Sequence, residues 1–118
     1  MKKAKEVLGK LAAVEGVRAA VLVSSDGFPL EAAVRDAALA PDELAAIARD
    51  GVTAVRRMVA ELGQGQFIQG VLESAQGSIL FTNLPAQLTL VLVAARGANK
   101  AALWNAAVAH FADVMAAL

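Results

Sequence analysis

The sequence predicts a mixed α/β domain in which a five-stranded antiparallel sheet lies between layers of helices, forming a three-layer α/β/α sandwich. The segments Val17–Val23 and Gln87–Ala95 are apolar on both faces, and a strand with this pattern is buried on both sides. Segments in which apolar residues recur every three or four positions come before, between and after the strand-like segments. These segments supply the helices that cover both faces of the sheet.

The order of the elements follows from these patterns and from the turn residues between them. We expect a helix over residues 2–15, strands over 17–23 and 28–35, a long helix over 41–62, strands over 66–73, 78–84 and 87–95, and a last helix capped by Asn99. The last helix carries an apolar stripe that consists of Leu103, Ala107, Val108, Phe111, Val114, Met115 and Leu118. At 118 residues, these elements form one domain over positions 1–118.

The place of each strand in the sheet is predicted from its charges and its connections. Ser24–Gly27 favours a tight turn, so the first two strands form a hairpin. Pro29 and the charged Glu31 disfavour further pairing of the second strand, which places it at an edge. The last three strands have short connections and form a meander. Because the 87–95 strand is apolar on both faces, we place it beside Val17–Val23, and the predicted order is 2-1-5-4-3.

The segment from Pro41 to Leu62 carries the strongest helix pattern in the sequence. Proline followed by Asp42 and Glu43 is typical of a first helical turn, and Gly63 follows the last apolar position. A helix of this length measures about 33 Å, whereas a sheet of five strands is about 19 Å wide. We therefore expect the long helix to exceed the width of its own sheet.

The third strand is the other predicted edge, and it lacks protection against further pairing. Gln66–Leu72 contains no lysine, proline or charge, so its free backbone groups are open to another strand. We expect the same strand of a second copy to pair there about a two-fold axis, with the long helices packed across the seam. The alternative is a monomer in which a loop or terminus covers this edge. The residues predicted for the dimer interface are Ala48, Val52, Val55, Val59, Gln66, Phe67, Ile68, Gln69 and Val71.

The composition argues against several classes of function. The eleven basic and eleven acidic residues are interspersed, so no nucleic-acid-binding face is indicated. The absence of cysteine excludes disulfides and thiolate chemistry. Glu6 and Lys10 interrupt the apolar residues near the amino terminus, which argues against a signal peptide. The most apolar stretch is shorter than the roughly 20 residues of a membrane-spanning helix. We expect a cytoplasmic protein without membrane insertion.

Candidate catalytic and metal-binding residues have structural explanations. His110 is the only histidine, and Asp113 is the one carboxylate among its helix neighbours, so no metal site is expected. The serines in Ser24–Asp26 lack a general base and are explained by the turn. Gly63–Gln66 is rich in glycine, but no Lys-Ser/Thr pair follows and the loop leads into a strand. We therefore expect no enzymatic activity, cofactor or metal.

Three segments together resemble the Roadblock/LC7 family. They are GVRAAVLVSSDGFPL at Gly16–Leu30, DELAA at the start of the long helix, and NKAAL at the start of the last helix. The resemblance covers nearly the whole chain. It implies a profilin-like fold and a dimer joined through the long helix and the third strand. It also implies association with Ras-like small GTPases, as a regulator or activating partner, or with larger scaffolds.

A surface for such a partner is predicted on the polar side of the long helix. This pattern is also that of a solvated helix face, but two such helices side by side present small and basic groups suited to a flat protein partner. The residues predicted for partner binding are Ala45, Arg49, Thr53, Arg56 and Arg57.

The function that we expect is a dimeric, non-enzymatic regulator that binds a small Ras-like GTPase and modulates its GTP hydrolysis cycle. One alternative is a dimeric structural adaptor without effect on nucleotide turnover. Another is a small-molecule sensor, against which the density of alanine, valine and leucine argues, because it predicts a filled core.

Overall fold

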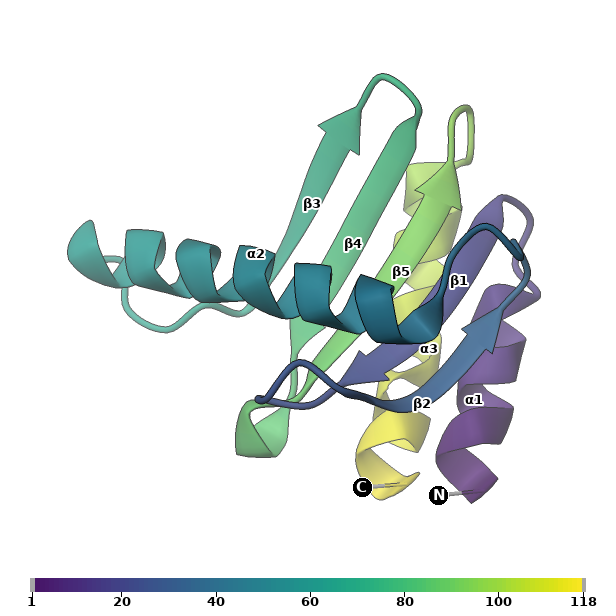
Figure 1. The fold of residues 1–118 in the computed structure, drawn as a ribbon, viewed down its shortest axis with the longest axis horizontal. Coiled ribbons are helices and arrows are strands. Elements are labelled where there is room, and N and C mark those ends of the chain that lie inside the picture. Colours follow the sequence, from purple (N-terminus) through teal and green to yellow (C-terminus); the bar gives the residue numbers. More distant parts are fainter. Residues whose placement is uncertain (1, 118) are drawn as a thin grey trace.

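The computed structural model describes residues 2–117 and shows a three-layer α/β/α sandwich, as predicted (Figure 1). Within these residues, the elements are helix α1 (Lys2–Ala12), strands β1 (Val17–Val23) and β2 (Pro29–Val34), helix α2 (Pro41–Glu61), strands β3 (Gln69–Ser74), β4 (Gly77–Asn83) and β5 (Thr89–Ala95), and helix α3 (Lys100–Ala117). A short 3-10 helix, η1 (Pro85–Gln87), connects β4 to β5.

The strands form one sheet in the order β2-β1-β5-β4-β3, and each strand is antiparallel to its neighbours. This confirms the predicted order. Helix α2 crosses one face of the sheet, and α1 and α3 lie on the other face (Figure 1). The central strands β1 and β5 are buried along almost their whole length, as the apolar pattern on both of their faces predicted.

The core consists of two apolar layers, one on each face of the sheet. Successive residues of a strand point to opposite faces. Thus Leu22 packs in the layer under α1 and α3, whereas Val21 packs in the layer under α2. The first layer includes Leu8, Leu11, Leu80, Leu90, Leu92 and Leu103. The second layer includes Ala45, Val52, Phe67, Phe81, Val91 and Val93.

The apolar stripe predicted for the last helix is confirmed only in part. Asn99 caps α3 as predicted, because its Oδ1 accepts a hydrogen bond from the Ala102 backbone N–H at 3.0 Å. Leu103 and Ala107 are buried, but Val108 is 62% exposed, so its assignment to the core was wrong. The predicted stripe positions Phe111, Val114, Met115 and Leu118 lie outside the residues whose side chains are described.

Two element boundaries differ from the predictions by three residues, and the other boundaries of the strands and of α2 agree to within two residues. Helix α1 ends at Ala12 rather than at residue 15, because a tight turn that includes Gly16, with φ of 90°, redirects the chain into β1. Strand β3 begins at Gln69 rather than Gln66. Phe67 turns inward beneath α2, with its ring centroid 5.7 Å from that of Phe81, and anchors the segment before β3 to the core.

The hairpin between β1 and β2 closes as the turn residues predicted. The backbone N–H of Ser24 donates to the Phe28 carbonyl at 2.9 Å, and Gly27 adopts φ of 84°. A Cβ atom at Gly27 would lie 3.4 Å from Cβ of Arg49, so the end of the hairpin packs against α2. Strand β2 lies at the edge of the sheet, where a register shift near Leu22 leaves Leu30 outside the pairing.

The connection from β2 to α2 is held by the carboxylate of Asp36. The Ala38 backbone N–H donates to Asp36 Oδ1 at 2.9 Å, and the Arg18 guanidinium donates to Asp36 Oδ2 at 2.8 Å. These bonds lower the pKa of the Asp36 carboxyl, the Ala38 bond making the larger contribution and the Arg18 bond the next. The contact joins the start of β1 to the loop that leads into α2.

The turn between β4 and β5 contains two non-glycine residues in the left-handed region of backbone conformation. Ala86 and Gln87 both have φ of 61°. The turn is closed by hydrogen bonds from the Leu88 N–H to the Pro85 carbonyl at 3.3 Å and from the Leu84 N–H to the Leu88 carbonyl at 2.8 Å. A left-handed conformation costs a residue with a Cβ atom roughly 1–2 kcal/mol, so this turn is strained.

Ala86→Gly should therefore stabilise the chain. Glycine removes the steric cost at φ of 61°, and its greater freedom in the unfolded state offsets roughly 0.5–1 kcal/mol of that gain. We expect the free energy of unfolding to rise by up to about 1 kcal/mol in urea denaturation. Ala75→Gly, in the exposed turn between β3 and β4 where φ is not positive, is the control and should lower stability. Equal losses in the two variants would contradict the prediction.

Candidate functional site

Helix α2 extends beyond the sheet that it crosses. It spans 21 residues, about 32 Å at 1.5 Å per residue, and its carboxyl-terminal end projects past β3 (Figure 1). The helix begins at Pro41, with Asp42 and Glu43 in its first turn, as predicted. The projecting part therefore has no strand of this chain beneath it.

Strand β3 lies at the end of the sheet and pairs only with β4 within residues 2–117. The pairing register places Leu72 opposite Ile79, on the face of α2, and Val71 opposite Leu80, on the face of α1 and α3. Leu72 is 53% exposed and Val71 is 43% exposed. This edge thus presents free backbone groups together with apolar side chains on both faces.

Exposed apolar side chains from α2 and from the segment around β3 occur near this edge. We call them the edge surface, which consists of Ile47, Met58, Leu62, Ile68, Val71 and Leu72. A hollow of about 130 Å³ between α2 and the sheet is lined by Ile47 and Leu72, among other apolar residues. Several large apolar side chains that are exposed together at an edge strand are typical of a protein interface.

The structure changes the list of predicted interface residues. Ile68 and Val71 belong to the edge surface, and Gln66 and Gln69 are exposed beside them. The predicted residues Ala48, Val55 and Val59 are partly buried against the core layer under α2. Val52 and Phe67 are only 4% and 5% exposed in the single chain, so their assignment to an interface was wrong: both fill the core.

Sequence reasoning did not assign Ile47, Met58, Leu62 and Leu72 to the interface. The first three share the apolar stripe of α2 with true core residues, and periodicity alone does not separate the two groups. For Met58 and Leu62 the available signal was the excess length of the helix, since a stripe longer than the sheet is wide must leave its last apolar residues uncovered.

The outer face of α2 carries most of the predicted partner-binding residues. Arg49, Thr53 and Arg57 are exposed. Ala45, by contrast, is fully buried and faces the sheet, so its assignment to the outer face was wrong. Arg49 forms an ion pair with Asp50, and Arg57 forms one with Glu61, both at 3.0 Å. The face is therefore mixed in charge rather than uniformly basic.

Arg56, the remaining predicted partner-binding residue, also contributes to the fold. Its Nη2 donates a hydrogen bond of 2.5 Å to Oδ1 of Asn83 at the end of β4. Both side chains are partly buried. This contact fixes the second half of α2 to the end of β4, and it leaves the Arg56 guanidinium group less available to a partner.

Phe28, at the end of the hairpin between β1 and β2, is a further exposed residue. Its side chain is 66% exposed at the start of β2, directly after Gly27, which packs against Ala46 and Arg49 of α2. Aromatic side chains are enriched at protein interfaces, so Phe28 is a candidate contact residue at this end of α2.

No group of three or more histidine, aspartate or glutamate residues within residues 2–117 is arranged to hold a metal ion. His110 lies on α3 with Nδ1 at 3.5 Å from Oδ2 of Asp113. In the part of the chain described by the structure, no helix combines the length and the apolar character required to span a bilayer.

The Roadblock/LC7 domain model matches residues 3–94. The chain belongs to the Roadblock/LC7 family. The match runs from the first helix into the last strand and includes the first two of the three resembling segments, while NKAAL at the start of the last helix follows it. A search of curated proteins gives no match to this Roadblock/LC7 chain.

Solved structures of Roadblock/LC7 proteins share the fold of this chain. Myxococcus xanthus MglB has a TM-score of 0.87 and 17% identity, over 97% of this chain and 86% of that one. The gliding protein MglB from Thermus thermophilus has a TM-score of 0.83 and 22% identity, over 97% and 87% of the two chains. A Roadblock/LC7 domain from Streptomyces avermitilis has a TM-score of 0.76 and 24% identity, over 86% of each. At these identities, the likeness establishes the fold.

The Arg56→Ala variant tests whether Arg56 stabilises the fold, in contrast to the exposed Arg57. It removes the hydrogen bond to Asn83, and we expect the free energy of unfolding to fall by about 1–2 kcal/mol. Arg57→Ala removes only an exposed ion pair with Glu61 and should cost less than about 0.5 kcal/mol. Denaturant unfolding measures both. Equal losses would show that the contact between Arg56 and Asn83 does not stabilise the fold.

Proposed function

We propose that this chain is a dimeric, non-enzymatic regulator in the cytoplasm that binds a small Ras-like GTPase and modulates its GTP hydrolysis. The observation that carries the proposal is the unpaired edge of β3, flanked by the edge surface, in a Roadblock/LC7 chain. Membership of this family implies association with Ras-like GTPases. The exposed outer face of α2 supports this association, because it offers a surface to the GTPase.

The proposed dimer pairs β3 with β3 of a second copy, antiparallel about a two-fold axis. This pairing supplies partners for the free backbone N–H and C=O groups of Gln69–Ser74. It also covers the exposed apolar side chains, and fully burying one large apolar side chain contributes about 1.5–3 kcal/mol before the cost of association. The projecting end of α2 then lies over the second sheet.

The proposed GTPase site is the outer face of the two α2 helices, completed at the side by the hairpin that carries Phe28. Arg49 and Arg57 pair with acidic residues of their own helix, so recognition relies on shape and mixed charge rather than on a basic patch. Arg56 is engaged by Asn83, which disfavours its use as an arginine finger. We infer that the chain acts by reshaping the switch loops of the GTPase.

Self-association is tested by Leu72→Asp. The substitution places a charge at the seam, where the proposed pairing would bury it, and we expect a monomer in size-exclusion chromatography with light scattering at concentrations where the wild type is a dimer. Leu30→Asp is the matched control, because Leu30 is 41% exposed on the opposite edge strand, β2. A Leu72→Asp variant that remains a dimer would exclude pairing through β3.

GTPase regulation is tested by reversing charge on the outer face. The double variant Arg49→Glu with Arg57→Glu should lose at least about tenfold of any stimulation of GTP hydrolysis by a partner GTPase, because glutamates beside Asp50 and Glu61 turn the mixed charge of the face into a negative one. It should remain a dimer, since neither residue is in the edge surface. Arg96→Glu, exposed after β5, is the control. Hydrolysis that the wild-type protein does not change, in a GTPase that it binds, would favour the adaptor function instead.

A further inference from the structure

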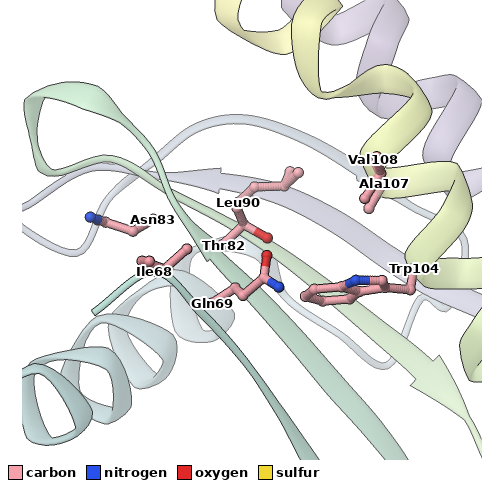
Figure 2. Close-up of a pocket in the computed structure, with 8 residues that line it drawn as sticks. All are labelled: Ile68, Gln69, Thr82, Asn83, Leu90, Trp104, Ala107 and Val108. Atoms are coloured by element: carbon pink, nitrogen blue, oxygen red, sulfur yellow. The ribbon is translucent and has the colours of Figure 1, made fainter. Parts of the chain in front are cut away.

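A second hollow lies on the opposite face of the sheet from α2. It has a volume of about 310 Å³ and opens between α3 and the strands β3 and β4 (Figure 2). Helices α1 and α3 cover this face over the other strands, and the hollow forms at the side of α3 where the β3 end of the sheet is not covered (Figure 1). Its lining consists of Ile68, Gln69, Thr82, Asn83, Leu90, Trp104, Ala107 and Val108.

The floor and walls of the hollow are apolar and aromatic. Leu90 is 2% exposed and forms the floor beside Thr82, its pairing partner on β4. Trp104 and Ala107 project from α3 on one side, and Ile68 lies on the other (Figure 2). None of these eight residues, which form the lining among the described side chains, carries a charge. A hollow with this lining disfavours a charged ligand, since it offers no counter-ion for a buried charge.

Two polar side chains in the hollow are available to a ligand. Figure 2 shows the amide of Gln69 beside the indole of Trp104, with the hydroxyl of Thr82 close to the same end. Among the described residues, neither the Gln69 amide nor the Thr82 hydroxyl takes part in a hydrogen bond within the chain. Asn83 is different, because its side chain points away from Trp104 and accepts the hydrogen bond from Arg56.

The core around the hollow is filled, as the composition predicted. Leu80, Leu90 and Leu92 are each about 2% exposed on this face of the sheet. The hollow therefore lies at the rim of the core, between two elements that are not in full contact. Its size is at the lower end of the range of small-molecule sites, which are typically apolar with a few polar groups that orient the ligand.

We propose that this hollow binds an uncharged, flat aromatic molecule. The ligand packs its ring against the indole of Trp104 and over Leu90. A carbonyl or amide group on the ligand exchanges hydrogen bonds with the Gln69 amide and the Thr82 hydroxyl. The proposal goes beyond GTPase regulation and does not depend on it, because the hollow and the outer face of α2 lie on opposite sides of the sheet. Ile68 and Gln69 also belong to the predicted dimer interface, so the test uses the protein in its native state of association.

The test uses naphthamide, a neutral bicyclic ring with a carboxamide group, as the probe. Trp104 is the only tryptophan in the chain, so an isotope-labelled protein gives a single indole N–H signal in its NMR spectrum, and that signal reports directly on the hollow. We expect naphthamide to shift this signal saturably. Naphthoate has the same ring system with a negative charge, and we expect it to bind more weakly because the lining offers no cation.

Substitutions in the hollow test whether naphthamide binds there. Ala107→Leu fills the hollow and should weaken naphthamide binding by about tenfold or more, while Ala109→Leu, an exposed position on the same helix, should leave binding unchanged. Thr82→Val keeps the shape of the side chain and removes the hydroxyl, and it should weaken binding by about three- to tenfold. If the NMR spectrum shows that Ala107→Leu does not fold, the affinity of the Thr82→Val variant for naphthamide decides whether the probe binds in the hollow.

Three results would overturn the proposal. The first is the absence of a saturable shift of the Trp104 signal up to the solubility limit of naphthamide. The second is a shift that is equal in the wild type and in the folded Ala107→Leu and Thr82→Val variants, which would place the probe elsewhere. The third is naphthoate binding at least as tight as naphthamide binding. None of these results bears on the proposed modulation of GTP hydrolysis, which has its own test.

Discussion

The pairing of β1 with β5 is the constraint on which the rest of the structure depends. Both strands are buried on both faces, so each face of the sheet must be covered, and the chain meets this requirement with α2 on one side and α1 with α3 on the other. Placing these two strands at the centre leaves β2 and β3 as the edges. The two edges differ: β2 begins with Pro29 and carries a register shift, whereas β3 presents regular backbone groups and exposed apolar side chains. The asymmetry of the sheet therefore decides where another molecule can attach.

Much of this architecture could be predicted from the sequence because the decisive signals are local. The apolar pattern of Val17–Val23, the proline at position 29 and the periodicity after Pro41 each describe the environment of their own segment. The boundaries that were missed depend on tertiary contacts. Phe67 turns inward to contact Phe81, which delays the start of β3, and no pattern within residues 66–73 indicates that Phe67 packs in the core.

The candidate site was predicted less completely than the fold, for a related reason. Periodicity shows which side of α2 faces the sheet, but it does not show how far the sheet extends beneath the helix. Val52 and Met58 occupy the same apolar stripe, yet Val52 is 4% exposed and Met58 is 53% exposed. Similarly, Arg56 and Arg57 are neighbours in the sequence with the same side chain, but only Arg56 donates a hydrogen bond to Asn83, a residue distant in the sequence. The extent of the sheet beneath α2 therefore determines which residues of this helix are buried and which are exposed.

Strand β3 links the two proposed surfaces, because its side chains alternate between the faces of the sheet. Leu72 contributes to the edge surface on the α2 side, whereas Gln69 contributes to the hollow beside Trp104.

The strand β3 is held by its pairing with β4 and by an ion pair between Glu73 and Lys100 at the start of α3. This ion pair is exposed, and exposed pairs contribute at most about 1 kcal/mol. The two walls of the hollow, α3 and β3, are thus joined by a weak contact, while the backbone edge that a second copy would use is held firmly by β4. A ligand that separates the walls slightly acts against the weak contact and leaves the strand pairing intact.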